Sequence, residues 1–384
     1  MRLTDPGDDQ FVGKGKKPSF YSEGEVQNYY QIRVAVCTIL KLILLANPNW
    51  RNSLENRLQL SLSTAYKVPA DCSTPRQDLF RQICSSVAWV EAIQGPQMKL
   101  GVVGLLPADI RTLNSQHLDA IRSLKLIGAC FHVNTEVLFE LTASNYEHIK
   151  LLYADHGMTL VQMGIAYNHC LFDPDYAVRQ RVIEIIGRGI RAAREFGADV
   201  ALIRTGSLNP TGSYDASRNN HEPEAMRLLI ATLRQIATMA ESAGQTIVIE
   251  THVLTILNSP ELIVEVISQV GSDRVRIVMD FVNHFQSLSQ IYASNARINY
   301  IFDTMGALCP VAHCKDICVQ NGFVMHFDEA APGDGELDLA CAIRRWQLLR
   351  PDGYMLLEHL PDAAYARAVA NVMRIAQAAG VPLT

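Results

Sequence analysis

Residues 246–280 read TIVIETHVLTILNSPELIVEVISQVGSDRVRIVMD, and this stretch decides the fold. It opens with a short apolar run, Thr246–Glu250, and closes with another, Val275–Asp280. Between them, Glu261–Val270 carries apolar residues on a helical period. Mostly apolar strands separated by a helix are typical of a parallel sheet covered by helices, so the stretch predicts one strand–helix–strand unit.

The same alternation runs from Met98 to the C-terminus and predicts a (β/α)₈ TIM barrel. The predicted strands are Lys99–Leu105, Leu126–His132, Thr159–Gly164, Ala198–Thr205, Thr246–Glu250, Val275–Asp280, Val311–Lys315 and Tyr354–Glu358. The clearest helical patterns are Tyr176–Glu195, Glu222–Ala243, Glu261–Val270, Ala340–Leu349 and Ala363–Ala379. A doubly wound open sheet is the alternative, but no Gly-x-Gly-x-x-Gly turn follows an early strand.

Residues 1–97 differ in pattern from the rest. Gly13–Pro18 is rich in Gly, Lys and Pro, and Asn47–Thr74 is rich in Ser, Asn and Gln without a sustained period. We therefore expect residues 1–97 to be an N-terminal extension, peripheral or poorly structured, and residues 98–384 to be the catalytic domain. Met98 directly precedes the first predicted strand and is a candidate translation start. The extension is expected to be dispensable for the chemistry.

Composition narrows the function classes. The chain has a net charge of −5, and residues 99–384 hold 23 Lys/Arg against 30 Asp/Glu. This acidic balance disfavours binding to nucleic acid. Nine cysteines without a repeated spacing indicate reduced thiols and a cytoplasmic location. The apolar run Ala35–Ala46 is too short to span a membrane and contains Lys41, so no membrane association is expected.

Polar residues lie at or near the C-terminal ends of four consecutive predicted strands, the fifth to the eighth. They are Glu250, Asp280, His313 and Glu358. Side chains alternate along a strand, so these four share the inward face with Val248, Val278, Val311 and Leu356. The C-terminal ends of barrel strands surround one mouth, where active sites of such barrels lie, so we expect the four side chains to converge there.

This set of residue types predicts a metal site. Three carboxylates in one cavity repel one another unless a cation or a proton intervenes. Carboxylate oxygens with a single imidazole suit Mn²⁺, Mg²⁺ or Co²⁺ better than they suit a structural zinc ion, which prefers thiolates and histidines. We therefore predict one divalent metal ion, with ligands Glu250, Asp280, His313 and Glu358.

Three further motifs accompany this order of ligands: Asp280-Phe-Val-Asn283, His313-Cys-Lys-Asp316 and Pro332-Gly-Asp-Gly-Glu336. Together they resemble the sugar phosphate isomerase/epimerase family of the xylose isomerase-like TIM barrels, and most closely its ketose 3-epimerase branch. The resemblance covers residues 98–384. It implies that the four residues hold one divalent metal and that Glu250 and Glu358 exchange protons with the substrate.

The chain also departs from the ketose 3-epimerase pattern. Those enzymes usually carry histidine three residues after the aspartate of the sixth strand, where this chain has Asn283, with His284 one place later. The family histidine contacts a substrate hydroxyl, so this change leaves the substrate open. Glu250 is followed by Thr251-His252 where the family commonly has Asn-His.

The resemblance predicts an isomerase or epimerase of carbohydrate metabolism that acts on a keto-sugar or related polyol through an enediolate. A lyase using the same residues is the alternative, such as an inosose dehydratase or an enzyme that eliminates from a keto-glycoside or decarboxylates a keto acid. An abasic-site endonuclease is less favoured, because it needs a histidine on the third strand, where Gln162 and Met163 stand. A non-catalytic binding barrel is less favoured because all four metal positions are filled.

Other polar residues near the strand ends are expected to bind the small-molecule sugar or polyol. Arg204 would bind a carboxylate or phosphate, or else pair with Glu250 or a loop acid. Lys315 would stabilise an enolate oxygen, or else form a salt bridge to a neighbouring acid. The predicted substrate-binding residues are His132, Arg204, His252, Asn283, His284 and Lys315. A homo-oligomer is compatible with the sequence.

Overall fold

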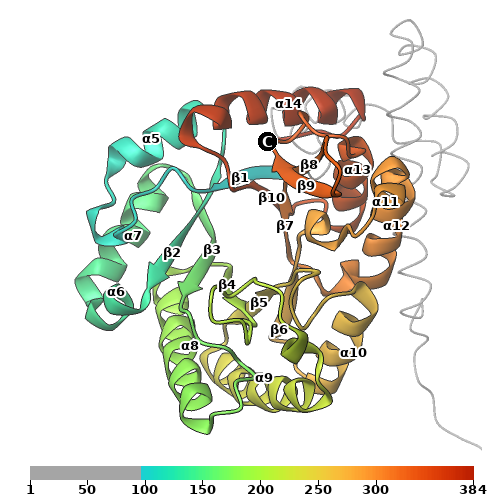
Figure 1. Cartoon of the computed structure of the whole chain (residues 1–384). Coiled ribbons are helices and arrows are strands. Elements are labelled where there is room, and N and C mark those ends of the chain that lie inside the picture. Colours follow the sequence, from blue (N-terminus) through green and yellow to red (C-terminus); the bar gives the residue numbers. More distant parts are fainter. Residues whose placement is uncertain (1–96) are drawn as a thin grey trace, which may run out of the picture. The chain divides into compact units, whose positions relative to one another are not determined.

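Eight parallel strands close into a barrel in the computed structural model, which describes residues 97–384 (Figure 1). Around the barrel the strands follow the order β1-β10-β7-β6-β5-β4-β3-β2. They are β1 (Lys99–Val103), β2 (Gly128–Asn134), β3 (Thr159–Ala166), β4 (Val200–Arg204), β5 (Thr246–Glu250), β6 (Val275–Met279), β7 (Val311–Cys314) and β10 (Tyr354–Leu357). The predicted TIM barrel is confirmed, and the open sheet is wrong. The predictions for residues 1–96 lie outside the described residues.

Helices surround the barrel and connect successive strands (Figure 1). They are α5 (Ser115–Ser123), α6 (Thr135–Glu140), α7 (Ala143–Asp155), α8 (Tyr176–Phe196), α9 (Pro223–Ala243), α10 (Pro260–Val270), α11 (Leu288–Tyr292), α12 (Ser294–Met305), α13 (Leu339–Leu349) and α14 (Tyr365–Ala378). Gly197, Gly244 and Gly271 end α8, α9 and α10 in the left-handed conformation, which glycine adopts without a steric penalty. Among residues 97–384, no helix is long and apolar enough to cross a membrane.

Two apolar cores flank the strands. The core inside the barrel contains one side chain from the inward face of most strands, including Val248, Val278, Val311 and Leu356. The larger core lies between the strands and the helices and includes the fully buried Trp346. The predicted alternation is therefore confirmed, because the four inward residues expected beneath the polar strand ends all belong to the inner core.

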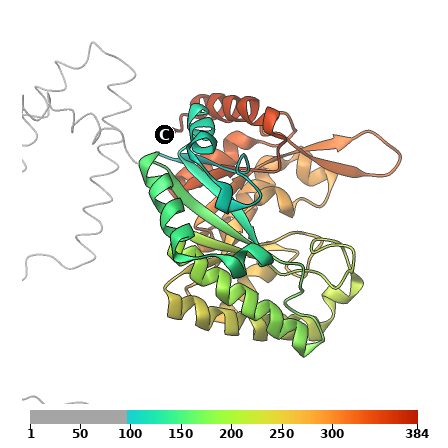
Figure 2. The same cartoon turned by 90° about the vertical axis from the view of Figure 1, so that its left-hand side faces the viewer.

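A two-stranded antiparallel hairpin follows β7 directly and was not predicted. It consists of β8 (Asp316–Gln320) and β9 (His326–Ala330). In Figure 2 it is the orange-red pair of strands that extends beyond the barrel. The predicted seventh strand ends at Lys315, and β7 ends at Cys314, so the hairpin begins at the mouth where polar side chains gather.

Gly101 tests the packing of the barrel wall. A Cβ atom there would lie 2.6 Å from Leu356 Cδ2 and 2.8 Å from the carbonyl oxygen of Gly128, on the two neighbouring strands. We expect Gly101→Ala to lower the free energy of unfolding by about 1–3 kcal/mol through overpacking, measured by urea denaturation. Gly322→Ala is the control, because its nearest neighbouring atom would lie at 3.7 Å. Equal midpoints for the two variants would contradict the prediction.

Candidate metal centre

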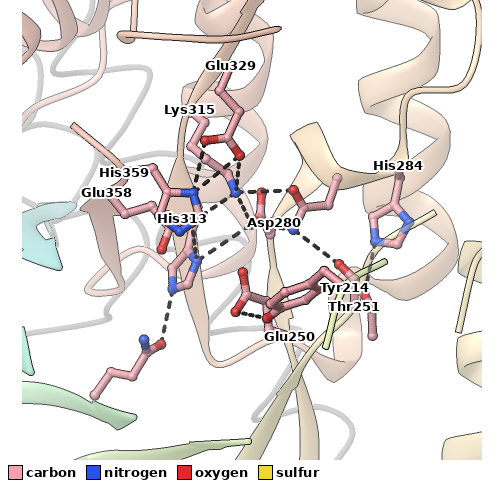
Figure 3. A network of polar contacts seen from close by, with 12 residues as sticks. Tyr214, Glu250, Thr251, Asp280, His284, His313, Lys315, Glu329, Glu358 and His359 are labelled. Carbon is pink, nitrogen blue, oxygen red and sulfur yellow. Dashed lines mark hydrogen bonds and ion pairs between the residues drawn. The ribbon is translucent and has the colours of Figure 1, made fainter. Parts of the chain in front are cut away.

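Four side chains from consecutive barrel strands meet at the C-terminal mouth (Figure 3). Each stands at or directly after the end of its strand: Glu250 in β5, Asp280 after β6, His313 in β7 and Glu358 after β10. All four are buried, and each offers one ligand atom within 4.8 Å of the others. The predicted convergence is observed.

The imidazole of His313 is held so that one nitrogen faces the carboxylates. Its Nε2 lies 3.1 Å from Gln162 Oε1, which leaves Nδ1 directed into the cluster. Nδ1 is 2.8 Å from Glu358 Oε1 and 3.7 Å from Asp280 Oδ2. When the imidazole is protonated, the contact with Glu358 is an ion pair.

Asp280 Oδ1 is buried and has no hydrogen-bond partner among residues 97–384. A buried polar atom without a partner is costly, so this oxygen indicates a missing partner. His313 Nδ1 and Glu358 Oε1 contact each other in the same cluster, and Glu358 Oε1 also contacts Lys315. Two carboxylate oxygens and one imidazole nitrogen, from three different strands, are suitable ligands for a divalent cation. The residues therefore fit a metal ion.

Lys315 brings a positive charge into the cluster. Its side chain is 2% exposed, and its ammonium lies 2.7 Å from Asp280 Oδ2 and 3.1 Å from Glu358 Oε1. It also lies 3.1 Å from Glu329 Oε1 on the hairpin and donates to Asn283 Oδ1. Of the two roles expected for Lys315, the salt bridge to neighbouring acids is the one observed.

The two glutamates lie in different electrostatic surroundings. Burial and the negative charge of Glu358 raise the pKa of Glu250. Burial also opposes ionisation of Glu358, but the charges of His313 and Lys315 lower its pKa well below the usual range. For His313, burial would lower the pKa, yet the adjacent carboxylates raise it to about 10. Glu250 is thus the more easily protonated of the two glutamates.

The comparisons with known proteins agree with this geometry. A sequence profile described as xylose isomerase-like TIM barrel matches residues 121–376. The chain belongs to this family. Among curated proteins, no match to the chain is found.

Solved structures share the fold of this xylose isomerase-like barrel. They include the 3-keto-D-glucoside 4-epimerase YcjR from E. coli, with 18% identity over 72% of this chain and 100% of that chain and a TM-score of 0.53. D-psicose 3-epimerase from Clostridium cellulolyticum H10, with D-tagatose, has 12% identity over 74% and 100%, TM-score 0.55. A xylose isomerase-like TIM barrel protein from Mycobacterium smegmatis, in complex with magnesium, has 17% identity over 75% and 97%, TM-score 0.56. At these identities the likeness shows the fold alone.

Three residues predicted to bind substrate in this xylose isomerase-like barrel lie at its mouth. His132 retains solvent access, and its ring covers Gly164, where a Cβ atom would lie 2.0 Å from the ring. The guanidinium of Arg204 stacks on two tyrosine rings, donates to a backbone carbonyl and forms no ion pair with any residue of 97–384. His252 is half-buried, and its Nδ1 accepts a hydrogen bond from the Leu254 amide.

Asn283 and His284 are bonded to protein partners. Asn283 Nδ2 donates to Asp280 Oδ2 at 2.7 Å and to the carbonyl oxygen of Thr251, so it holds the Asp280 carboxylate in place. His284 is fully buried, and its Nε2 lies 3.1 Å from Thr251 Oγ1 on the side away from the four clustered side chains (Figure 3). Asn283 therefore belongs to the cluster, whereas His284 supports it from behind.

Three residues of the site were not predicted: Tyr214, Glu329 and His359. Tyr214 donates a hydrogen bond to Glu250 Oε2. Glu329 of β9 accepts from His359 Nδ1 at 2.9 Å while its other oxygen contacts Lys315. Tyr214 and Glu329 lie on segments outside the alternating strands and helices of the barrel. No sequence pattern therefore identified them as site residues. For His359 the sequence offered one indication of a place in the site, since it directly follows Glu358.

Asp316 connects two of the sequence motifs, His313-Cys-Lys-Asp316 and Pro332-Gly-Asp-Gly-Glu336, through hydrogen bonds. Its Oδ2 accepts from the amides of Gly333 and Gly335 at 3.0 and 3.1 Å, and its Oδ1 accepts from those of Ile317 and Leu337. A Cβ atom at Gly335 would lie 2.4 Å from Asp316 Oδ1, which accounts for the glycine. The aspartate after Lys315 thus fixes the Pro-Gly-Asp-Gly turn that follows the hairpin.

The buried His284 makes stability depend on pH. Burial lowers its pKa from 6.5 to about 4, so between these values the unfolded chain binds more protons than the folded chain. Stability is therefore lost as the pH falls through this window. From this residue we expect the free energy of unfolding to drop by about 2 kcal/mol between about pH 7 and pH 5.

Urea denaturation of His284→Gln at both pH values measures that contribution. Glutamine keeps a polar partner for Thr251 but does not titrate, so this variant should lose less stability at the lower pH than the wild type. His326→Gln is the control, because His326 lies exposed on the hairpin. An unchanged pH dependence in His284→Gln would contradict the assignment.

Proposed function

We propose that one divalent metal ion, Mn²⁺, Mg²⁺ or Co²⁺, is bound by Glu250, Asp280, His313 and Glu358. We further propose that the protein is an isomerase or epimerase of a small keto-sugar or related polyol. The observation that carries both proposals is the meeting of three carboxylates and one imidazole at one mouth, where the buried Asp280 Oδ1 has no hydrogen-bond partner among residues 97–384. The magnesium complex of the Mycobacterium smegmatis barrel supports a divalent metal.

Glu250 and Glu358 are the proposed proton-transfer residues. They lie at the two ends of the row of ligands, because β6 and β7 separate β5 from β10 around the barrel. One glutamate would remove a proton from the carbon of a hydroxy-ketone, and the other would return a proton to the opposite face, which is epimerisation. Return to the neighbouring carbon gives aldose–ketose isomerisation. A bound divalent cation would supply positive charge beside the developing enediolate.

Elimination is the alternative outcome with the same residues. If a leaving group lies β to the carbanion, its expulsion makes the protein a lyase, such as an inosose dehydratase. The fold is shared with a 3-keto-D-glucoside 4-epimerase and a D-psicose 3-epimerase. Both names describe epimerases, and this favours epimerisation as the first activity to test.

The six predicted substrate-binding residues divide into two groups. His132, Arg204 and His252 surround the mouth and are proposed to contact substrate directly, and Lys315 lies near enough to Glu358 to stabilise an enediolate oxygen. Asn283 is bonded to Asp280, and His284 is bonded to Thr251. We propose that these two act by orienting their partners.

We also propose a cytoplasmic location. All six cysteines of the described residues are free, as is typical of a reducing compartment. The dispensability of the N-terminal extension stays a prediction. It is tested by comparing the turnover of the full chain with that of a chain that starts at Met98.

Substitution of single ligands separates metal binding from proton transfer. Glu358→Gln keeps a ligating oxygen but removes the base, so Mn²⁺ binding should largely survive while the rate falls by about 10²–10⁴-fold. Asp280→Asn should instead weaken Mn²⁺ binding, and excess Mn²⁺ should partly restore the rate. Calorimetric titration with Mn²⁺ and solvent-deuterium incorporation, followed by NMR, measure the two effects.

The panel for this test contains keto-sugars, inososes and 3-keto-glycosides, with the Mn²⁺-loaded wild type as reference. Deuterium incorporation alone identifies the activated carbon, and loss of a leaving group identifies a lyase. Near-normal deuterium incorporation in both Glu250→Gln and Glu358→Gln would show that neither glutamate is the base. The epimerase mechanism would then have to be abandoned.

A further inference from the structure

Tyr214 connects a loop outside the barrel wall to one of the proposed bases. It lies on the segment 205–222 between β4 and α9, and its hydroxyl donates a hydrogen bond to Glu250 Oε2 (Figure 3). Side-chain hydrogen bonds within the loop, including Ser207 Oγ to the Asp215 carbonyl oxygen and the Leu208 amide to Asn220 Oδ1, fix its shape. These hydrogen bonds fix the backbone of the loop, and so the position from which the Tyr214 side chain reaches Glu250.

The ring of Tyr214 is held from two sides. The guanidinium of Arg204, at the end of β4, lies 5.6 Å from the ring centroid in a cation–π contact. The ring of His252, just after β5, approaches edge-on with centroids 6.1 Å apart. Arg204 is itself fixed, because it donates to the carbonyl oxygen of Tyr167 and stacks on that ring as well. The hydroxyl therefore has little freedom to leave Glu250.

We propose that Tyr214 is a positioning residue for Glu250, held in place by Arg204. The effect of Tyr214 on catalysis rests on the proposed function, because that function makes Glu250 a base. The hydrogen bond between Tyr214 and Glu250 does not rest on it. The bond to Oε2 stops the carboxylate from rotating. It leaves Oε1 as the oxygen that would bind the proposed metal ion. Glu358 has a different anchor, since it is held by His313 and Lys315. The two proposed bases are thus oriented by chemically different groups.

The hydrogen bond can be tested without a substrate. In the metal-free full chain, we expect Tyr214→Phe and Glu250→Ala each to speed amide hydrogen exchange in peptides covering 205–222 by about 10-fold, and the double variant to add no further increase. Tyr176→Phe is the matched control, because an arginine also stacks on this exposed tyrosine at 5.6 Å. Unchanged exchange in Tyr214→Phe, or additive effects in the double variant, would overturn the proposal.

The proposed positioning of Glu250 by Tyr214 can also be tested by measuring kcat and KM. With Mn²⁺-loaded protein and D-fructose as the first probe, Tyr214→Phe should lower kcat by about 10-fold and leave KM nearly unchanged, because phenylalanine keeps the ring. Because Arg204 is also a proposed substrate contact, its support of Tyr214 is measured by amide exchange in the metal-free chain, where Arg204→Gln should speed exchange in 205–222 but add little in the Tyr214→Phe background. Additive effects of these two substitutions on exchange, or a loss in Tyr214→Phe confined to KM, would contradict the role.

The two tests also separate this inference from the proposed function. If no probe of the panel incorporates deuterium in the wild type, the epimerase proposal fails, whereas the exchange measurement still decides whether Tyr214 is bonded to Glu250. If the wild type turns over and the loop is unaffected by Tyr214→Phe, the proposed function stands and the positioning role is rejected.

Discussion

The mutual repulsion of three buried carboxylates is the constraint on which the rest of the site depends. Two such charges about 5 Å apart repel by about 3 kcal/mol at an effective dielectric constant of 20, so Glu250, Asp280 and Glu358 need positive charge close by. Lys315 provides one positive charge. With neutral His313, a divalent cation would bring the positive charge to three, which equals the number of carboxylates. The lysine thus makes the site suitable for a divalent ion.

The protonation state of His313 would differ between the metal-free protein and the metal-bound protein. Without a metal ion, the carboxylates raise its pKa to about 10, and the imidazolium then adds positive charge to the cluster. A metal ligand must be neutral, so metal binding would release this proton. Gln162 keeps the ring in the same orientation in both states, because it binds the nitrogen that faces away from the carboxylates. The position that disfavoured an endonuclease in the sequence is therefore filled by a residue that orients the imidazole of His313.

Sequence periodicity was sufficient for the barrel and for the convergence of Glu250, Asp280, His313 and Glu358, because both follow from local rules. A strand of period two determines which residues face inward, and the parallel arrangement brings the strand ends to one mouth. Tyr214 and Glu329 could not be found in this way. Their roles arise from contacts between segments far apart in the chain, at Glu250 for the first and at Lys315 and His359 for the second. The hairpin escaped prediction because its strands, with mixed exposure, lack the apolar runs of the barrel.

His359 shows how firmly the end of β10 is fixed. Its φ of 56° lies in the left-handed region, which costs a residue with a Cβ atom roughly 1–2 kcal/mol. The ion pair between His359 and Glu329 is about half exposed, and such pairs contribute about 0–1 kcal/mol, so it offsets only part of this cost. The remainder comes from the preceding strand, where Met355, Leu356 and Leu357 are fully buried. The strained turn lies directly after Glu358, at the point where the chain leaves the barrel wall and the glutamate faces the other ligands.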